Sequence, residues 1–361
     1  MTVADIISYL EKIAPASLAQ PGDAIGLHVG DTSARITRIA VAVDPTRAVI
    51  DQAECIGAEL LVCHHPLIRA PIESVTASSE KGDLVMRAIQ AGLSVYVMHT
   101  NYDCAPGGVS DALAERLGVG DTRPLSAAPT EPYYKVVVFV PDEAVEAVRA
   151  AMCRAGGFIG AYSDCSFRAR GVGTFKPLPG AHPYIGEEGK LEQTDEWRLE
   201  TMASESALPK VIESMIRAHP YEEVAYDIYP LRNEPPPPAG LGRIGRLKKP
   251  ESLGDFRKRV ERLLKCQGFT RAIGNPRRKV ETVALCGGGG ATLIPDAAKQ
   301  GADVYVTGDV GHHALLTAQW HKLAVIDAGH FPTEKPGVEA LANALAREYS
   351  SRGVEVEYVD R

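Results

Sequence analysis

The sequence predicts an α/β protein in which two similar βα halves form one core and an α+β domain interrupts them. Two patterns support this fold class. In both outer parts of the chain, short apolar segments alternate with amphipathic segments of about 10–15 residues, which is typical of βαβ units and a mostly parallel sheet. In the middle part the order of the apolar segments changes, and a proline-rich run follows.

The clearest element of the first half is the apolar segment 60–63, which has the composition of a buried strand and is followed by His64 and His65. Pro66 ends this strand because proline has no N–H to donate to a neighbour. In open parallel sheets, ligands bind outside the carboxyl ends of the strands, so we expect the functional site there. The other elements expected in this half are strands over 36–43 and 93–98 and helices over 4–14, 48–56, 80–91 and 107–117.

The middle part, residues 129–232, is predicted to be an inserted domain. Its expected elements are strands over 133–140, 163–175, 190–202 and 222–230 and helices over 142–154 and 206–218. The resulting order, β-α-β-β-α-β, is that of ferredoxin-like domains. Residues 233–241, which include four consecutive prolines, are predicted to form a stiff, extended linker.

The βα alternation resumes in the second half of the core, so the core is predicted to comprise 1–128 and 233–361. We expect strands over 280–285, 303–307, 324–326 and 354–359 and helices over 252–266 and 292–300. A closing helix is expected to begin with Thr333 as its N-cap and Pro336 in its first turn. The basic residues between Arg243 and Lys265 are interpreted as a solvated helix face.

The two halves repeat a pattern of histidines at the ends of strands. A histidine pair occurs in each half, at 64/65 and at 312/313. Each half also has a histidine followed four residues later by an acid, His99 with Asp103 and His330 with Glu334. We interpret this repetition as an ancestral duplication.

Imidazoles and carboxylates at strand ends are the ligands of divalent zinc, iron, manganese and cobalt. One ion needs three or four protein ligands, and five residues are candidates here: His64, His65, Asp103, His330 and Glu334. The surplus favours two ions about 3.5–4 Å apart, bridged by a carboxylate and a water that becomes a nucleophile at neutral pH. Glu334 is the expected bridge.

Three nearby residues, His99, Asp309 and His313, are candidate catalytic residues. They could equally orient the metal ligands, contact a substrate, or be hydrogen-bonded polar groups beside the sheet. Asp44 and Thr46, at another strand end, are candidate pocket residues. The glycine run could cradle a phosphate with its N–H groups or form a tight turn, and it consists of Gly287, Gly288, Gly289 and Gly290.

These motifs together resemble the NIF-three-like family, whose members are known as GTP cyclohydrolase 1 type 2 homologues. The resemblance covers both halves of the core in the same order. It rests on Asp23-x-x-Gly26-Leu27-x-x-Gly30, His64-His65-Pro66-Leu67-Ile68, His99-Thr100-Asn101-Tyr102-Asp103, Gly107-Gly108-Val109-Ser110-Asp111, Gly308-Asp309-x-x-x-His313 and Gly329-His330-x-x-Thr333-Glu334.

The resemblance implies a dinuclear centre with one metal on His65, Asp103 and Glu334 and the other on His64, His330 and Glu334. It also implies a PII- or CutA-like insert and assembly into a homohexamer. The implied activity is metal-dependent hydrolysis of GTP, and a phosphoester substrate suits the same metal geometry equally well. The alternative is a non-enzymatic metal-handling protein whose insert senses an effector or directs assembly.

The composition excludes some partners. A net charge of −7 argues against general binding to nucleic acid or to membrane surfaces, and the chain has no apolar run long enough to span a bilayer. Seven cysteines without CxxC spacing are expected to be reduced thiols, so we expect a cytoplasmic protein. An interaction protein of the transcription machinery is the weakest alternative, because no nucleic-acid recognition motif is present.

Overall fold

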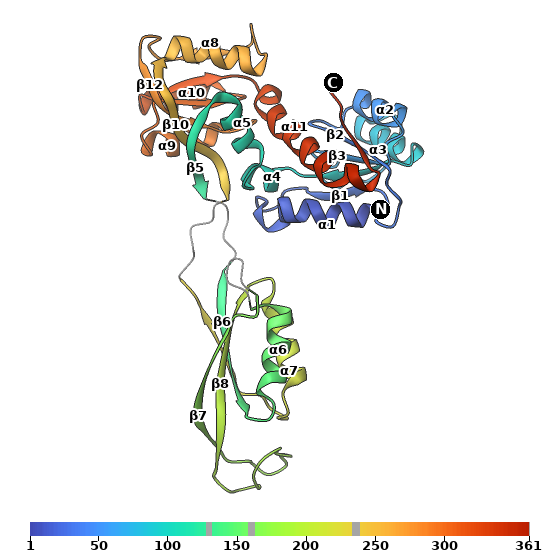
Figure 1. The fold of residues 1–361 in the computed structure, drawn as a ribbon, viewed down its shortest axis with the longest axis vertical. Coiled ribbons are helices and arrows are strands. Elements are labelled where there is room, and N and C mark those ends of the chain that lie inside the picture. Colours follow the sequence, from blue (N-terminus) through green and yellow to red (C-terminus); the bar gives the residue numbers. More distant parts are fainter. Residues whose placement is uncertain (128–131, 158–162, 233–238, 361) are drawn as a thin grey trace. The chain divides into compact units, whose positions relative to one another are not determined.

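The computed structural model describes residues 1–127, 132–157, 163–232 and 239–360. Its contacts divide the chain into two compact units (Figure 1). Unit 1 comprises Met1–Pro129 and Pro236–Arg361, and unit 2 comprises Thr130–Pro235. Most of the predicted proline-rich linker, at 233–238, lies outside the described residues.

The first sheet of unit 1 has five strands in the order β1-β4-β3-β2-β15. Strands β4, β3, β2 and β15 are parallel, and β1 joins β4 antiparallel. The strand bounds are β1 Gly26–Val29, β2 Arg38–Ala42, β3 Leu60–Cys63, β4 Ser94–Val97 and β15 Glu355–Tyr358. All four residues of β3 and of β4 are buried, as is typical of parallel strands that helices cover on both faces.

Helices cover both faces of this first sheet. The apolar residues of α1 (Val3–Ile13) and α11 (His330–Tyr349) pack against one face. Those of α2 (Arg47–Cys55) and α3 (Glu80–Gln90) pack against the other. Because α11 comes from the second half of the sequence, the two halves share this core.

The second sheet has six strands in the order β11-β14-β13-β12-β10-β5, of which β12, β13 and β14 are parallel. The bounds are β5 Val119–Ala127, β10 Gly240–Ser252, β11 Arg271–Ile273, β12 Lys279–Leu285, β13 Val304–Thr307 and β14 Ala324–Asp327. Helices α5 (Val109–Leu117) and α8 (Leu253–Leu264) cover one face, and α9 (Ile294–Lys299) and α10 (His312–Trp320) cover the other. The short helix α4 (Thr100–Cys104) follows β4.

Unit 2 consists of β6 (Tyr133–Pro141), α6 (Val145–Ala155), β7 (Ser166–Phe175), β8 (Glu192–Ser204), α7 (Leu208–Ala218) and β9 (Tyr226–Pro230). Its four strands form an antiparallel sheet in the order β7-β8-β6-β9. The apolar residues of α6 and α7 pack on one face of this sheet. The elements follow the order expected from the sequence.

Several expectations about local structure were wrong or incomplete. The closing helix begins at His330, with Gly329 as its N-cap, and Pro336 lies inside it. Thr333 does not cap the helix, because its hydroxyl donates to the carbonyl oxygens of Gly329 and His330. The strands β5, β10 and β11 were not anticipated, and Arg243 lies in β10 with only 2% of its surface exposed rather than on a solvated helix face.

No helix among the described residues has the length and apolar composition needed to cross a membrane.

The insertion point lies on an antiparallel pair of strands. β5 is the last element before the insert and β10 the first after it, and Ala127 is paired with Gly240. The two positions at which the chain leaves and re-enters the core are therefore neighbours, close enough for a tight hairpin turn to join them.

We therefore predict that replacing residues 128–239 with an Asn-Gly turn leaves the core folded. The shortened chain should show the circular dichroism of an α/β protein and one cooperative thermal transition, with the full-length chain as the reference. Aggregation, or a melt without a cooperative transition, would show that the core requires the insert.

Candidate metal centre

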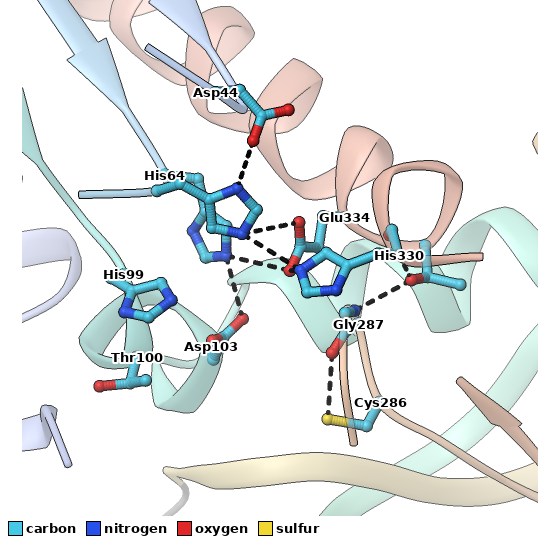
Figure 2. A network of polar contacts seen from close by, with 12 residues as sticks. Asp44, His64, His99, Thr100, Asp103, Cys286, Gly287, His330 and Glu334 are labelled. Carbon is cyan, nitrogen blue, oxygen red and sulfur yellow. Dashed lines mark hydrogen bonds and ion pairs between the residues drawn. The ribbon is translucent and has the colours of Figure 1, made fainter. Parts of the chain in front are cut away.

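The five predicted metal ligands lie together in unit 1 (Figure 2). His64 and His65 directly follow β3, and Asp103 lies on α4, directly after β4. His330 and Glu334 lie on α11, one turn apart and therefore on the same face of the helix. The packing of α11 against the first sheet thus brings second-half side chains to the carboxyl ends of first-half strands.

Glu334 lies at the centre of this cluster. Its Oε1 is 2.9 Å from His330 Nε2 and 3.5 Å from His64 Nε2, and its Oε2 is 3.3 Å from His65 Nε2. Asp103 Oδ1 is 3.7 Å from His64 Nε2, and the Nε2 atoms of His65 and His330 are 3.2 Å apart. The donor atoms of His65, His330 and Glu334 lie within 4.8 Å of one another, as do those of His64, His65 and His99. These groups could bind a metal ion.

Each imidazole of the cluster, and that of the neighbouring His99, is held from outside through its Nδ1 atom. His64 Nδ1 donates to the carbonyl oxygen of Met98 at 2.8 Å. The other three donate to carboxylates: His65 to Asp44 at 2.7 Å, His99 to Asp23 at 2.8 Å, and His330 to Asp309 at 2.6 Å. Outer acceptors of this kind fix the tautomer and the ring orientation of metal-binding histidines. The Nε2 atoms are therefore left for the interior of the cluster.

The electrostatics of the cluster depend on Glu334. Burial alone would raise its pKa, but the charge of His64 and the hydrogen bond from His330 hold that pKa well below its usual range. The hydrogen bond to Glu334 raises the pKa of His330 to about 9. Burial opposes protonation of His65, yet the neighbouring carboxylates of Asp44 and Glu334 raise its pKa to about 10. Without a metal ion, these imidazoles hold protons close to the Glu334 carboxylate.

Asp103 and His64 form the more deeply buried part of the cluster. Burial raises the pKa of Asp103 to about 6, although the charge of His64 opposes this change. Burial disfavours the protonated form of His64, but the charges of Asp103 and Glu334 outweigh it and raise the pKa of His64.

Three polar atoms of the cluster are buried without a hydrogen-bond partner among the described residues. They are His64 Nε2, Asp103 Oδ1 and Glu334 Oε2. Buried polar atoms are almost always paired, so three such atoms in one cluster call for an explanation. A divalent cation satisfies both imidazole and carboxylate lone pairs, and this donor set suits zinc, iron, manganese or cobalt. The residues present therefore fit a metal site.

The other predicted site residues lie at different places. His99 adjoins the cluster, with its ring centroid 5.3 Å from that of His64, and Figure 2 shows one ring nitrogen turned toward His64 and Asp103. Asp309 holds His330 from outside and is largely exposed. His313 lies exposed in the first turn of α10, and the structure shows no hydrogen bond or ion pair from its side chain to any described residue.

The glycine run lies against the cluster. Gly288 N–H donates to the Thr333 hydroxyl and Gly290 N–H to the Thr307 hydroxyl, each at 2.9 Å, so these two groups already have partners inside the protein. Only Gly289 is exposed, and a Cβ there would lie 3.8 Å from Asp309 Oδ2. At Gly288, where φ is +62°, a Cβ would lie 2.2 Å from Glu334 Oε1. The absence of a side chain at Gly288 therefore leaves room for the Glu334 carboxylate.

Sequence reasoning gave no role to two groups that orient the cluster. Asp23 accepts from His99 and also from the N–H and hydroxyl of Thr100, and the Met98 carbonyl oxygen accepts from His64. Asp23 belongs to a recognisable motif, but its distance of 76 residues from His99 hides the pairing. A carbonyl oxygen carries no sequence signal at all. Asp44, a candidate pocket residue, accepts a hydrogen bond from His65 Nδ1.

The fold and the cluster define the class of this protein. It is an α/β protein with a buried group of His, Asp and Glu side chains whose donor atoms suit a divalent metal ion. The family model described as Duf34/NIF3 (NGG1p interacting factor 3) matches residues 1–361, and the chain belongs to this family.

Named relatives and solved structures agree with this assignment. The chain is 42% identical to proteins named "GTP cyclohydrolase 1 type 2 homolog" from Halalkalibacterium halodurans and Bacillus subtilis. The first alignment covers 90% of this chain and 87% of the relative, and the second covers 95% and 92%. A Bacillus cereus protein described as related to NIF3 is 39% identical, with a TM-score of 0.80 over 100% of this chain and 96% of that one. A Staphylococcus aureus protein of known structure is 27% identical, with a TM-score of 0.81 over the same shares.

The pKa values of His65 and His330 predict that metal binding releases protons. Near neutral pH both imidazoles are protonated in the metal-free protein, and a cation needs their Nε2 lone pairs. Apparent affinity should therefore rise with pH until it levels off above the pKa of His65, about 10. Calorimetric titration with zinc in buffers of different ionisation enthalpy measures the protons released. Release that does not change between neutral pH and the pKa of His65 would contradict this account.

We predict that Gly288→Ala weakens metal binding about 10–100-fold, because the added Cβ displaces Glu334. Gly301→Ala is the matched control, since its φ is +79° and a Cβ there would have no neighbour within 4 Å. Both variants should lose about 1 kcal/mol through backbone strain. Equal metal affinities in the two variants, measured by competition with a chelator, would show that Glu334 tolerates the Cβ.

Proposed function

We propose that this protein binds two divalent metal ions per chain and uses them to hydrolyse a nucleotide or phosphoester substrate. The observation that carries the proposal is the placement of Glu334, whose Oε1 lies 3.5 Å from His64 Nε2 and whose Oε2 lies 3.3 Å from His65 Nε2. A carboxylate in this position can bridge two ions.

The distances favour a particular division of the ligands between the ions. His64, Asp103 and Glu334 would hold one ion, because Asp103 lies against His64. His65, His330 and Glu334 would hold the other, because the Nε2 atoms of His65 and His330 are 3.2 Å apart. This division differs from the one implied by the family resemblance, which groups His65 with Asp103. The order of the ligands in the sequence does not fix which histidine meets which acid, so the proposed division rests on these distances between side chains.

Exposure at one side of the cluster supports catalysis over storage. The side chains of His64 and Glu334 are almost completely buried, but 35% of His330 and 64% of Asp309 are exposed. A substrate can therefore approach from the side of His330, past Gly289. A site built only to retain metal needs no such opening.

When bound, two divalent ions supply Lewis acidity and lower the pKa of a water shared between them. The protein's own residues orient and shield this chemistry. Asp44, Asp309 and the Met98 carbonyl oxygen fix the ligand imidazoles, and the buried strands β3 and β4 exclude water from behind the cluster. His99, held by Asp23, faces the cluster without being needed as a ligand, so it is placed to accept a hydrogen bond within the site.

The substrate class follows from the relatives' names and from the site chemistry. The relatives are named as homologues of a GTP cyclohydrolase, which makes GTP the first compound to test. A pair of metal ions suits phosphoester hydrolysis equally well. We also propose that unit 2 is a ferredoxin-like module of the PII or CutA type, because its strand order β7-β8-β6-β9 is the order of that fold.

The test combines metal content with turnover. Protein purified without added metal, and protein reconstituted with zinc, iron(II) or manganese(II), should contain two ions per chain and hydrolyse GTP or generic phosphoesters until a chelator is added. Two ions without turnover of any of these substrates would favour metal handling. One ion or none after reconstitution would contradict the dinuclear centre.

We predict that Glu334→Gln retains at most one metal ion per chain, because an amide has only one oxygen and no charge to offer two cations. Glu339→Gln is the matched control, since Glu339 lies on the same helix and pairs with Arg116 away from the cluster. The control should bind two ions. Two ions in the Glu334→Gln variant, by elemental analysis of folded protein, would exclude the bridging role.

A further inference from the structure

Arg243 is a fully hydrogen-bonded guanidinium in the interior of the core. Its five N–H groups have five acceptors. Nε and one terminal nitrogen bond the two oxygens of Asp111, at 2.6 and 2.8 Å. The remaining donors bond the carbonyl oxygens of Gly240, Gly242 and Ala105, at 2.6, 2.8 and 3.1 Å.

A buried guanidinium is tolerated only when its charge and all its donors are satisfied. Here the planar fork of Arg243 matches the Asp111 carboxylate, a geometry that lysine cannot reproduce. Gly242 has φ of +63°, and a Cβ on it would lie 2.8 Å from the Leu285 carbonyl oxygen. This turn of the backbone, which favours glycine, allows both Gly240 and Gly242 to direct their carbonyls to the same guanidinium.

Arg243 donates hydrogen bonds to acceptors from both halves of the core and so connects them. Gly240 and Gly242 belong to β10, in the second half. Ala105 is the C-cap of α4, and Asp111 lies in the first turn of α5, both in the first half. Asp111 Oδ2 also accepts from Gly107 N–H at 2.7 Å. The segment 105–111, here named the α4–α5 corner, is therefore held by a hydrogen bond within it and by the hydrogen bonds from Arg243 of β10.

Asp103 lies two residues before this corner. It belongs to α4, a helix of only five residues, and its Oδ1 has no hydrogen-bond partner among the described residues. The N-terminal end of α4 is held by Asp23, which accepts from the N–H and the hydroxyl of Thr100. The C-terminal end is held by Arg243 through the carbonyl oxygen of Ala105. The position of the Asp103 carboxylate therefore depends on contacts at the two ends of one short turn.

We propose that Arg243 is a positioning residue for Asp103, so that the metal position at His64 and Asp103 is complete only when β10 holds the α4–α5 corner. This inference rests on the proposed metal centre. None of the described ligands of the position formed by His65 and His330 lies on α4, because they come from the end of β3 and from α11.

The test is the metal affinity of Arg243→Lys, with Arg246→Lys as the matched control. Arg246 lies three residues further along β10 and is exposed. Stepwise titration with cobalt(II) against a chelator, followed by the visible absorption of the bound ion, resolves the two equivalents. In Arg243→Lys we expect one equivalent to bind at least about tenfold more weakly and the other to be unchanged. The control should bind both as the unmodified protein does.

A double-mutant cycle separates positioning from general stabilisation. If Arg243 acts through Asp103, Arg243→Lys should cause no further loss of affinity in an Asp103→Asn background. Two results would overturn the inference while leaving the metal centre intact. One is that the losses of affinity caused by Arg243→Lys and Asp103→Asn add in the double variant, and the other is that folded Arg243→Lys binds both equivalents with unchanged affinity. If Arg243→Lys does not fold, Asp111→Asn, which preserves side-chain shape, takes its place in the same cycle. Unmodified protein that binds no cobalt(II) would instead overturn the proposed function itself.

Discussion

The metal centre depends on hydrogen bonds that hold four imidazole rings by their outer nitrogens. Because Asp44, Asp309, Asp23 and the Met98 carbonyl oxygen occupy the Nδ1 atoms, the Nε2 atoms are left to face the interior around Glu334. These acceptors follow β2, β4 and β13 or precede β1, so both sheets contribute to the orientation of the rings. The folding of the sheets thereby sets the geometry at which a metal ion could bind.

Helix α11 connects the two halves of the core. Its apolar side packs on the first sheet together with α1, while Thr333 accepts a hydrogen bond from the glycine run that follows β12 of the second sheet. His330 and Glu334 lie on either side of Thr333 in the first turns of this helix. Arg243 makes a second connection between the halves, because it lies on β10 and donates to the carbonyl oxygen of Ala105 in the first half. The cluster therefore requires both halves, although each half has its own sheet and core.

Local sequence patterns predicted most of the elements and the candidate ligands, and tertiary contacts determined what could not be predicted. The buried segment 60–63 and the i, i+4 spacing of His330 and Glu334 are local signals, and the structure has the strand and the helix there. Thr333 has the chemistry of an N-cap, yet its hydroxyl bonds the glycine run, 45 residues away. Arg243 looks like a surface residue in a basic stretch, and its burial depends on Asp111, 132 residues away. Pairings over such distances leave no periodic signal.

The most direct test of the central claim is anomalous diffraction from crystals of the zinc-loaded protein. We expect two anomalous peaks about 3.5–4 Å apart, with the Glu334 carboxylate between them. One peak should adjoin His64 and Asp103, and the other His65 and His330. A single peak, or two peaks of which only one adjoins Glu334, would contradict the claim that this carboxylate organises a dinuclear centre.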